Sequence, residues 1–251
     1  MSKNTVWVFG DSFSEDVENV PKDISHGQAQ KRWEYVNKIL NGVPFKIFPR
    51  IISDKIGYKY KNYAANGGIY FEHLAGGNSN DQMFYNITEQ SSRFRKGDVV
   101  FVGFTSPNRY QVCRSDGGIM SVLPNQDMGI NTSRYLENYV ERDHPYYIYE
   151  MLQKFKILET LSYVVGFKIY YWDWGNRFDR VPDLNPTNWI SYETFSEFKF
   201  FEEIFRENGL TKSTIADESN GLVDDGHWGK NANDLLADIF YPTVKKFVDS
   251  I

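Results

Sequence analysis

The feature that most constrains the fold of this chain is the alternation of short strand-like runs with longer helical patterns. Runs rich in β-branched and aromatic side chains occur at residues 5–9, 58–64, 98–105 and 167–172. Helical patterns lie between and after them, an alternation typical of an α/β domain with a mainly parallel sheet. With 251 residues the chain can bury one sizeable core, so we predict a single domain over residues 1–251.

Turn and capping signals predict where the helices begin and end. Asn80 is predicted to cap a helix that reaches about Phe94, and Pro145 suits the first turn of a helix that ends before Gly166. Further helices are predicted over residues 28–40, 48–56, 191–208 and 231–248. Residues 106–143 have little periodicity and carry prolines and a Gly-Gly pair, which predicts a surface excursion that contributes to a binding site.

Composition and charge narrow the class of protein. Hydrophobic residues form 41% of the chain and charged residues 24%, which excludes intrinsic disorder. A formal net charge of -5 offers no general basic surface for nucleic acid. Cys113 is the only cysteine, so an intrachain disulfide and a cysteine-based zinc site are excluded. No membrane-length apolar run or signal peptide is recognised, so a cytoplasmic location is expected by default.

The residues that follow the first strand-like run are the first candidates for chemistry. In a doubly wound sheet the ligand crevice lies beyond the carboxyl ends of the strands, and here that position holds Gly10-Asp11-Ser12. A serine at such a turn is placed as a nucleophile, and neighbouring backbone N–H groups can bind an anion. The alternative is a serine that only caps a helix.

A serine nucleophile needs a base, and His227 is the best candidate among the four histidines. It precedes the last predicted helix and follows Asp224 by three residues, with Gly226 between them to allow a tight turn. At that spacing the Asp224 carboxylate can fix the tautomer of the imidazole and stabilise its charged form. The alternatives are a polar loop that caps the helix and a metal site of Asp224, Asp225 and His227, for which no known ligand spacing is present.

Together the two motifs resemble those of the SGNH/GDSL hydrolase family. Residues 8–14 are similar to the first block of the family, and residues 224–227 to the last, Asp-x-x-His. The resemblance implies that Ser12 is the nucleophile, His227 the base and Asp224 the residue that orients it. It also implies a flavodoxin-like three-layer α/β/α sandwich with a mainly parallel five-stranded sheet and no metal or organic cofactor. The implied reaction is hydrolysis of an ester or thioester through an acyl-enzyme.

The resemblance also suggests the donors of an oxyanion hole. Residues 62–67 look like the second block, Asn-x-Ala-x-x-Gly, which implies that the backbone N–H of Gly67 binds the oxyanion. Gly77 competes with it, because residues 77–80 resemble the Gly-x-Ser-Asn continuation of that block; Gly67 is favoured because it follows a predicted strand closely. The donor asparagine of the third block is missing, since Thr105 stands in its place and Asn108 follows three residues later.

Aromatic side chains in the loops near the candidate site bear on the substrate. They are Tyr70, Phe71, Trp172, Trp174, Trp189 and Trp228. Such rings either stack on sugar faces or pack into the core. We expect a serine esterase that acts on O-acetylated carbohydrates, with short-chain lipid or thioester hydrolysis as a close alternative. A catalytically weak carbohydrate-binding or structural module, and a metal-dependent hydrolase that uses Asp11, Asp224 and His227, are the alternatives from other classes.

Overall fold

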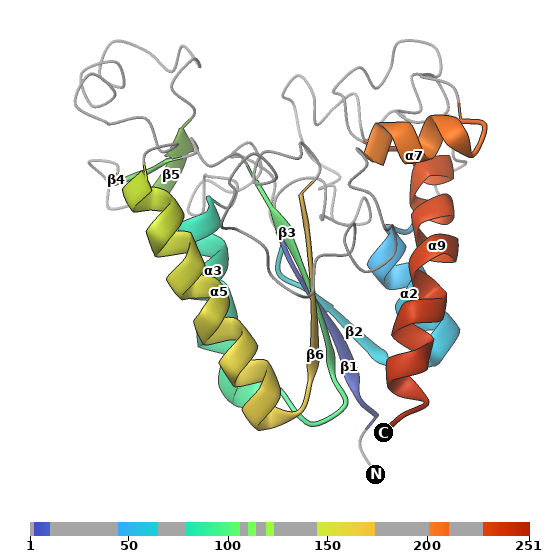
Figure 1. Cartoon of the computed structure of the whole chain (residues 1–251), viewed down its shortest axis with the longest axis horizontal. Helices are drawn as coiled ribbons and strands as arrows, with labels where there is room; N and C mark the ends of the chain where they lie inside the picture. The colour runs from blue at the N-terminus through green and yellow to red at the C-terminus, as the bar shows by residue number, and fades with distance from the viewer. Residues whose placement is uncertain are drawn as a thin grey trace, which may run out of the picture.

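Four parallel strands form one sheet in the computed structural model, with helices on both faces (Figure 1). The sheet contains β1 (Thr5–Phe9), β2 (Lys59–Asn62), β3 (Val99–Phe104) and β6 (Lys168–Asp173) in the order β2-β1-β3-β6. The structure describes residues 3–10, 45–64, 79–105, 110–113, 119–122, 145–173, 201–210 and 228–251. The α/β class with a parallel sheet is confirmed, and within these residues the sheet has no fifth strand.

The apolar runs of β1 and β3 explain their central positions. Every residue of both strands is buried, as expected for parallel strands that are covered on both faces. β2 is different, because its residues alternate between exposed and half-buried and include Lys59 and Lys61. Among the described residues it pairs only with β1, and lysines on such an edge strand oppose pairing with another chain.

The alternation of side chains along the strands creates two cores. Val6 and Val8 of β1 pack toward α2 (Phe48–Ile56) and α9 (Lys230–Val248), together with α7 (Phe201–Glu207). Trp7 and Phe9 pack toward α3 (Asn80–Gln90) and α5 (Pro145–Val165) on the opposite face. Figure 1 shows these two helical layers on either side of the sheet. The period of two residues in a strand therefore separates the side chains of β1 between the two cores.

Several element boundaries agree with the sequence, and two findings differ from it. The helices that begin at Phe48 and Pro145 have the predicted bounds. Ser79, not Asn80, caps α3, because its hydroxyl accepts the N–H of Gln82 at 3.2 Å. Serine and asparagine are both strong cap formers, so the sequence does not show which of the two residues is the cap.

The second difference is a hairpin inside residues 106–143, the segment predicted to be a surface excursion. β4 (Tyr110–Cys113) pairs antiparallel with β5 (Ile119–Val122) in a separate two-stranded sheet. Both strands are short, and the Gly117-Gly118 pair between them is a turn signal that could have indicated the hairpin. In the view of Figure 1 the labels β4 and β5 mark this hairpin at the upper left.

Asp98 organises the amino edge of the sheet. Its side chain is 1% exposed and accepts three hydrogen bonds, from the backbone N–H of Thr5 at 2.9 Å, from Trp7 Nε1 at 2.9 Å and from the backbone N–H of Arg95 at 3.1 Å. The turn before it contains Gly97 at φ 87°, where an added Cβ would meet the side chain of Asn4. The Asp98 carboxylate and the turn at Gly97 together hold β1 against the start of β3.

The structure also bears on the predicted absence of a membrane span. Within the ranges given above, no helix combines the length and the apolar character needed to cross a membrane.

Candidate functional site

The strand order creates a topological switch point between β1 and β3. From β1 the chain continues to β2 on one side, and it later returns to β3 on the other side of β1. The connections therefore leave these two neighbouring strands in opposite directions, and in α/β proteins ligands bind beyond the carboxyl ends of strands at such a point. This edge of the sheet is the candidate functional site.

The pairing register relates the two strand ends to each other. Phe9 of β1 is paired with Val102 of β3. Ser12 follows Phe9 by three residues, and Thr105 follows Val102 by three residues. The predicted nucleophile and one predicted oxyanion donor thus each follow a member of the Phe9–Val102 pair by the same number of residues. This relation concerns the sequence positions only, because Ser12 is outside the described residues.

Of the residues predicted for the triad and the oxyanion hole, Thr105 is the only one that the structure describes. The others lie outside the described residues, so their predicted roles stay predictions; they are Ser12, Gly67, Gly77, Asn108, Asp224 and His227. The same holds for Asp11 and Asp225, which belong to the metal alternative. Among the described residues, no group of three or more His, Cys, Asp or Glu side chains could hold a metal ion.

The side chain of Asn80 holds the backbone of Thr105. Asn80 Oδ1 accepts the backbone N–H of Thr105 at 3.0 Å, and Asn80 Nδ2 donates to the carbonyl oxygen of Thr105 at 3.1 Å. Both residues are buried, with 2% and 1% of their surfaces exposed. The amide of Asn80 therefore takes the place of a neighbouring strand at the point where β3 ends, and it joins this strand end to the first turn of α3.

These bonds change what Thr105 can offer at the site. Its backbone N–H already donates to Asn80, so it is not a free donor for a bound anion. Its hydroxyl is buried and has no hydrogen-bond partner among the described residues. The group that remains available at this strand end is therefore the Thr105 hydroxyl.

A second buried asparagine anchors the segment that follows His227. Asn233, in the first turn of α9, donates to the carbonyl oxygen of Gly229 at 2.9 Å and to that of Trp228 at 3.3 Å. Its Oδ1 accepts the backbone N–H of Phe48 at 3.0 Å. Trp228 directly follows the predicted base in the sequence. The backbone on the carboxyl side of His227 is therefore fixed to the start of α2.

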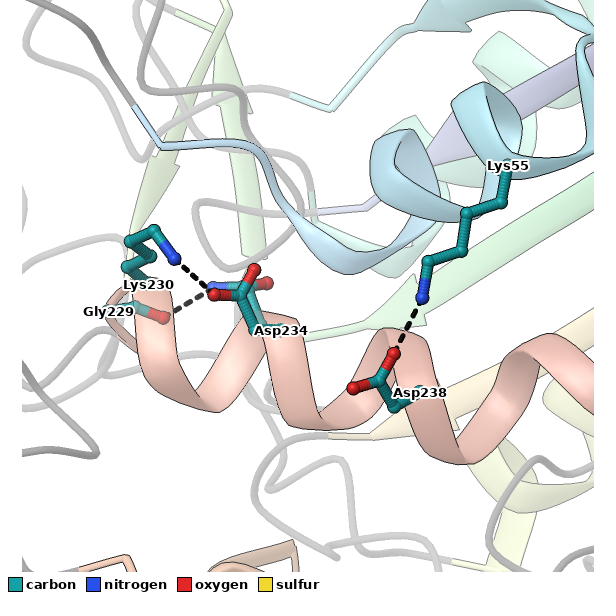
Figure 2. A network of polar contacts seen from close by, with 6 residues as sticks. Lys55, Gly229, Lys230, Asp234 and Asp238 are labelled. Carbon is teal, nitrogen blue, oxygen red and sulfur yellow. Dashed lines mark hydrogen bonds and ion pairs between the residues drawn. The ribbon is translucent and has the colours of Figure 1, made fainter.

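Ion pairs on the outer side of these helices contribute less. Figure 2 shows Lys55 of α2 beside Asp238 of α9, with 2.6 Å between Lys55 Nζ and Asp238 Oδ1, and Lys230 paired with Asp234 one turn along α9. The side chains of Lys55 and Asp238 are 38% and 71% exposed. Exposed pairs of this kind typically contribute less than about 1 kcal/mol. The buried Asn233 contacts are therefore the stronger anchor between α2 and α9.

Two tryptophans that the sequence analysis considered for sugar stacking are part of the core. Trp172 is 1% exposed and Trp228 is 8% exposed. Their ring centroids are 5.4 Å apart, and the Phe205 ring packs edge-on against Trp228 at 5.4 Å. For these two residues the packing alternative is correct. Tyr70, Phe71, Trp174 and Trp189 lie outside the described residues.

Tyr171 of β6 is a buried titratable group on the face covered by α3 and α5. Burial raises the pKa of Tyr171 far above its usual range, and the negative charge of Glu159 raises it further. The phenol therefore keeps its proton at all ordinary pH values and does not serve as a base. Among the described residues this is the clearest titration shift in the interior, and it belongs to the core.

Sequence reasoning did not identify Asn80 and Asn233 as parts of the site. Asn80 ends the Gly-x-Ser-Asn run and is predicted from the sequence to cap a helix, while Asn233 lies within the last predicted helix. A polar residue at a position where the helix faces the core is the signal that could have indicated each of them. Asn80 bonds to the backbone of Thr105, 25 residues away, and Asn233 bonds to the backbone of Phe48, 185 residues away, so no local pattern identifies these two partners.

Comparison of the chain with models of known protein families, with curated proteins and with solved structures finds no match. A function for this edge of the sheet must therefore be argued from the residues of this chain alone.

Proposed function

We propose that this protein is a serine esterase of the SGNH/GDSL type, with Ser12 as nucleophile, His227 as base and Asp224 as the residue that orients His227. The observation that carries the proposal is the switch point between β1 and β3. Ser12 follows β1 within three residues, as expected for a group that acts at this crevice. The anchoring of Trp228 and Gly229 by Asn233 supports a defined backbone directly after His227.

The proposed reaction proceeds through an acyl-enzyme. His227 takes the proton of Ser12 as the Ser12 oxygen bonds to the ester carbonyl carbon, and the C=O π electrons move onto the carbonyl oxygen. When that oxyanion collapses, the ester C–O bond breaks and the leaving alcohol takes the proton from His227. Water then repeats the two steps, so the carboxylic acid is released and Ser12 regains its proton.

The oxyanion needs preorganised donors. The proposed backbone donors are the N–H groups of Ser12 and Gly67, with Gly77 as the alternative to Gly67. Thr105 and Asn108 are the candidates for the donor that follows β3. Loss of one such donor typically lowers kcat by about 10²- to 10³-fold, so the number of donors present is measurable from single variants.

The proposed substrate class is an O-acetylated carbohydrate. Trp172 and Trp228 are buried and are not available to stack on a sugar. The aromatic residues that support sugar stacking by their sequence positions are Tyr70, Phe71, Trp174 and Trp189. Acetyl transfer to water needs only a small acyl pocket, so acyl chain length is the property that separates this substrate from a lipid ester with a longer acyl chain. Turnover of p-nitrophenyl acetate, p-nitrophenyl butyrate and acetylated oligosaccharides measures it.

The proposal is tested by labelling and turnover of the purified protein. A serine-directed fluorophosphonate should label the wild-type protein, and Ser12→Ala should abolish the label and lower turnover by about 10³-fold or more. Ser14→Ala is the matched control, because it removes a hydroxyl two residues away, and it should keep both the label and turnover. EDTA should leave turnover unchanged.

Other outcomes would contradict the proposal. A wild-type protein that neither reacts with the probe nor turns over any ester would indicate a binding or structural module. Turnover that EDTA removes would indicate a metal-dependent hydrolase. Full activity in folded Ser12→Ala would remove Ser12 from the mechanism.

A further inference from the structure

The end of β3 combines two unusual features at one residue. The backbone N–H and carbonyl of Thr105 are both bonded to the side chain of Asn80, at 3.0 and 3.1 Å. The hydroxyl of the same residue is buried and has no partner among the described residues. The Asn80 side chain thus satisfies the backbone of Thr105, while the Thr105 hydroxyl has no hydrogen-bond partner among the described residues.

An unsatisfied buried hydroxyl destabilises the folded protein, because it gives up its hydrogen bonds with water. Most buried polar groups have a partner, so an exception in a folded protein calls for an explanation. A valine has nearly the same shape and would avoid the penalty. The position of Thr105 at the switch point suggests that its partner belongs to a bound ligand.

The contacts of Asn80 explain why the hydroxyl is held in place. Asn80 belongs to the first turn of α3, which is capped by Ser79, and is itself 2% exposed. Two hydrogen bonds from one rigid amide restrict both backbone dihedrals of Thr105. Since the χ1 angle of threonine has few allowed rotamers, a fixed backbone limits its hydroxyl to few positions.

We infer that Asn80 is a positioning residue for the oxyanion hole, and that by binding both backbone groups of Thr105 it makes the Thr105 hydroxyl the donor that β3 contributes. This inference rests on the proposed function. The hydroxyl donates a hydrogen bond to the oxyanion of the tetrahedral intermediate and keeps its proton throughout. Asn80 does not touch the substrate and acts only through Thr105.

The two candidate donors after β3 differ in chemistry, and this difference distinguishes a Thr105 donor from an Asn108 donor. Asn108, three residues further on, would donate through a side-chain amide, as in the resemblance described above. The Thr105 hydroxyl instead provides one O–H donor. The two possibilities predict opposite results for the removal of one side chain at a time.

The decisive variant is Thr105→Val, which removes the hydroxyl and keeps the shape and both backbone groups. We expect kcat on p-nitrophenyl acetate to fall by about 10²-fold, with KM changed less than about threefold. The melting temperature should stay the same or rise by roughly 2 °C, because an unsatisfied buried hydroxyl is replaced by a methyl group. A purely structural role for Thr105 predicts neither a fall in kcat nor a more stable variant.

Two further substitutions complete the set. Thr105→Ser keeps the hydroxyl and should recover most of the lost kcat, and Asn108→Ala should have little effect. Asn80→Ala should lower kcat by about tenfold or more at similar KM. In the Asn80→Ala background, Thr105→Val should lower kcat much less than it does alone, because residues that act through one another are not additive.

Ser162→Ala is the matched control for lost stability. Ser162 is buried, and its hydroxyl donates to the carbonyl oxygen of Phe167 at 2.7 Å, directly before β6 and thus at the opposite edge of the sheet. Its removal should lower the melting temperature without a change in kcat. A loss of kcat in this control equal to that in Asn80→Ala would show that general destabilisation explains the effect.

The outcomes separate the inference from the proposed function. If the wild-type protein hydrolyses the ester and Thr105→Val keeps its kcat, the proposed function stands and the inference is wrong. If Asn108→Ala loses about 10²-fold instead, the donor is Asn108. A melting temperature that falls by more than about 5 °C in Thr105→Val would mean that the hydroxyl has a structural partner, which also overturns the inference. A wild-type protein without turnover or probe labelling overturns both.

Discussion

Replacement of Asp98 should lower the free energy of unfolding of this protein more than replacement of any exposed aspartate. In Asp98→Asn one oxygen is lost, so the new amide cannot accept from all of Thr5, Trp7 and Arg95. If the remaining oxygen keeps the bonds from Trp7 and Arg95, the new NH₂ group faces the N–H of Thr5. One buried donor then has no acceptor, which costs about 2 kcal/mol. Asp98→Ala leaves three donors without their acceptor, and we expect a loss of about 4 kcal/mol or more.

Thermal unfolding measures both variants. For a chain of this size each kcal/mol corresponds to roughly 2–4 °C in melting temperature, so the alanine variant should melt at least about 8 °C below the wild type. Asp238→Asn is the matched control, because it is the same change at a side chain that is 71% exposed, and it should shift stability by no more than about 0.5 kcal/mol. The fluorescence of Trp7 should also change in the Asp98 variants, since its indole N–H loses its partner.

Equal melting temperatures of Asp98→Asn and Asp238→Asn would contradict this prediction. The three buried bonds would then contribute nothing beyond an exposed carboxyl group. Because Asp98 lies at the amino edge of the sheet, opposite the candidate site, folded Asp98 variants should keep their kcat. A loss of kcat in fully folded protein would contradict the placement of the site at the carboxyl edge.

Three other predictions concern the candidate site. Asp224→Asn should lower turnover at least about tenfold more than Asp225→Asn, because only Asp224 has the three-residue offset to His227; equal losses would mean that the register of this motif is wrong. Turnover should rise with pH through an apparent pKa of about 6 to 7, because His227 must be neutral to accept a proton, and a flat profile from about pH 5 to 8 would contradict that role. Asn233→Ala should lower both melting temperature and kcat, because it releases Gly229 and the backbone after His227; a lower melting temperature with unchanged kcat would make Asn233 purely structural.

The regular part of the fold could be predicted from the sequence because its signals are local. An unbroken apolar run such as Val99–Phe104 is compatible with a strand covered on both faces, and Pro145 before a long apolar pattern marks a helix start. Short elements with weak signals were missed, as the β4–β5 hairpin shows. The choice between Ser79 and Asn80 as the cap of α3 could not be made, because both side chains favour that position.

The sequence by itself determined the chemical types at the candidate site: a serine after the first strand, an Asp-x-x-His motif before the last helix, and a threonine in place of an expected asparagine. Only the tertiary structure decided that β1 and β3 are neighbours, that Trp172 and Trp228 belong to the core, and that Asn80 holds Thr105 across 25 residues of chain. Strand order and buried side-chain partners depend on how separate segments pack against one another. Periodicity and capping signals act within a few residues and carry no information about that packing.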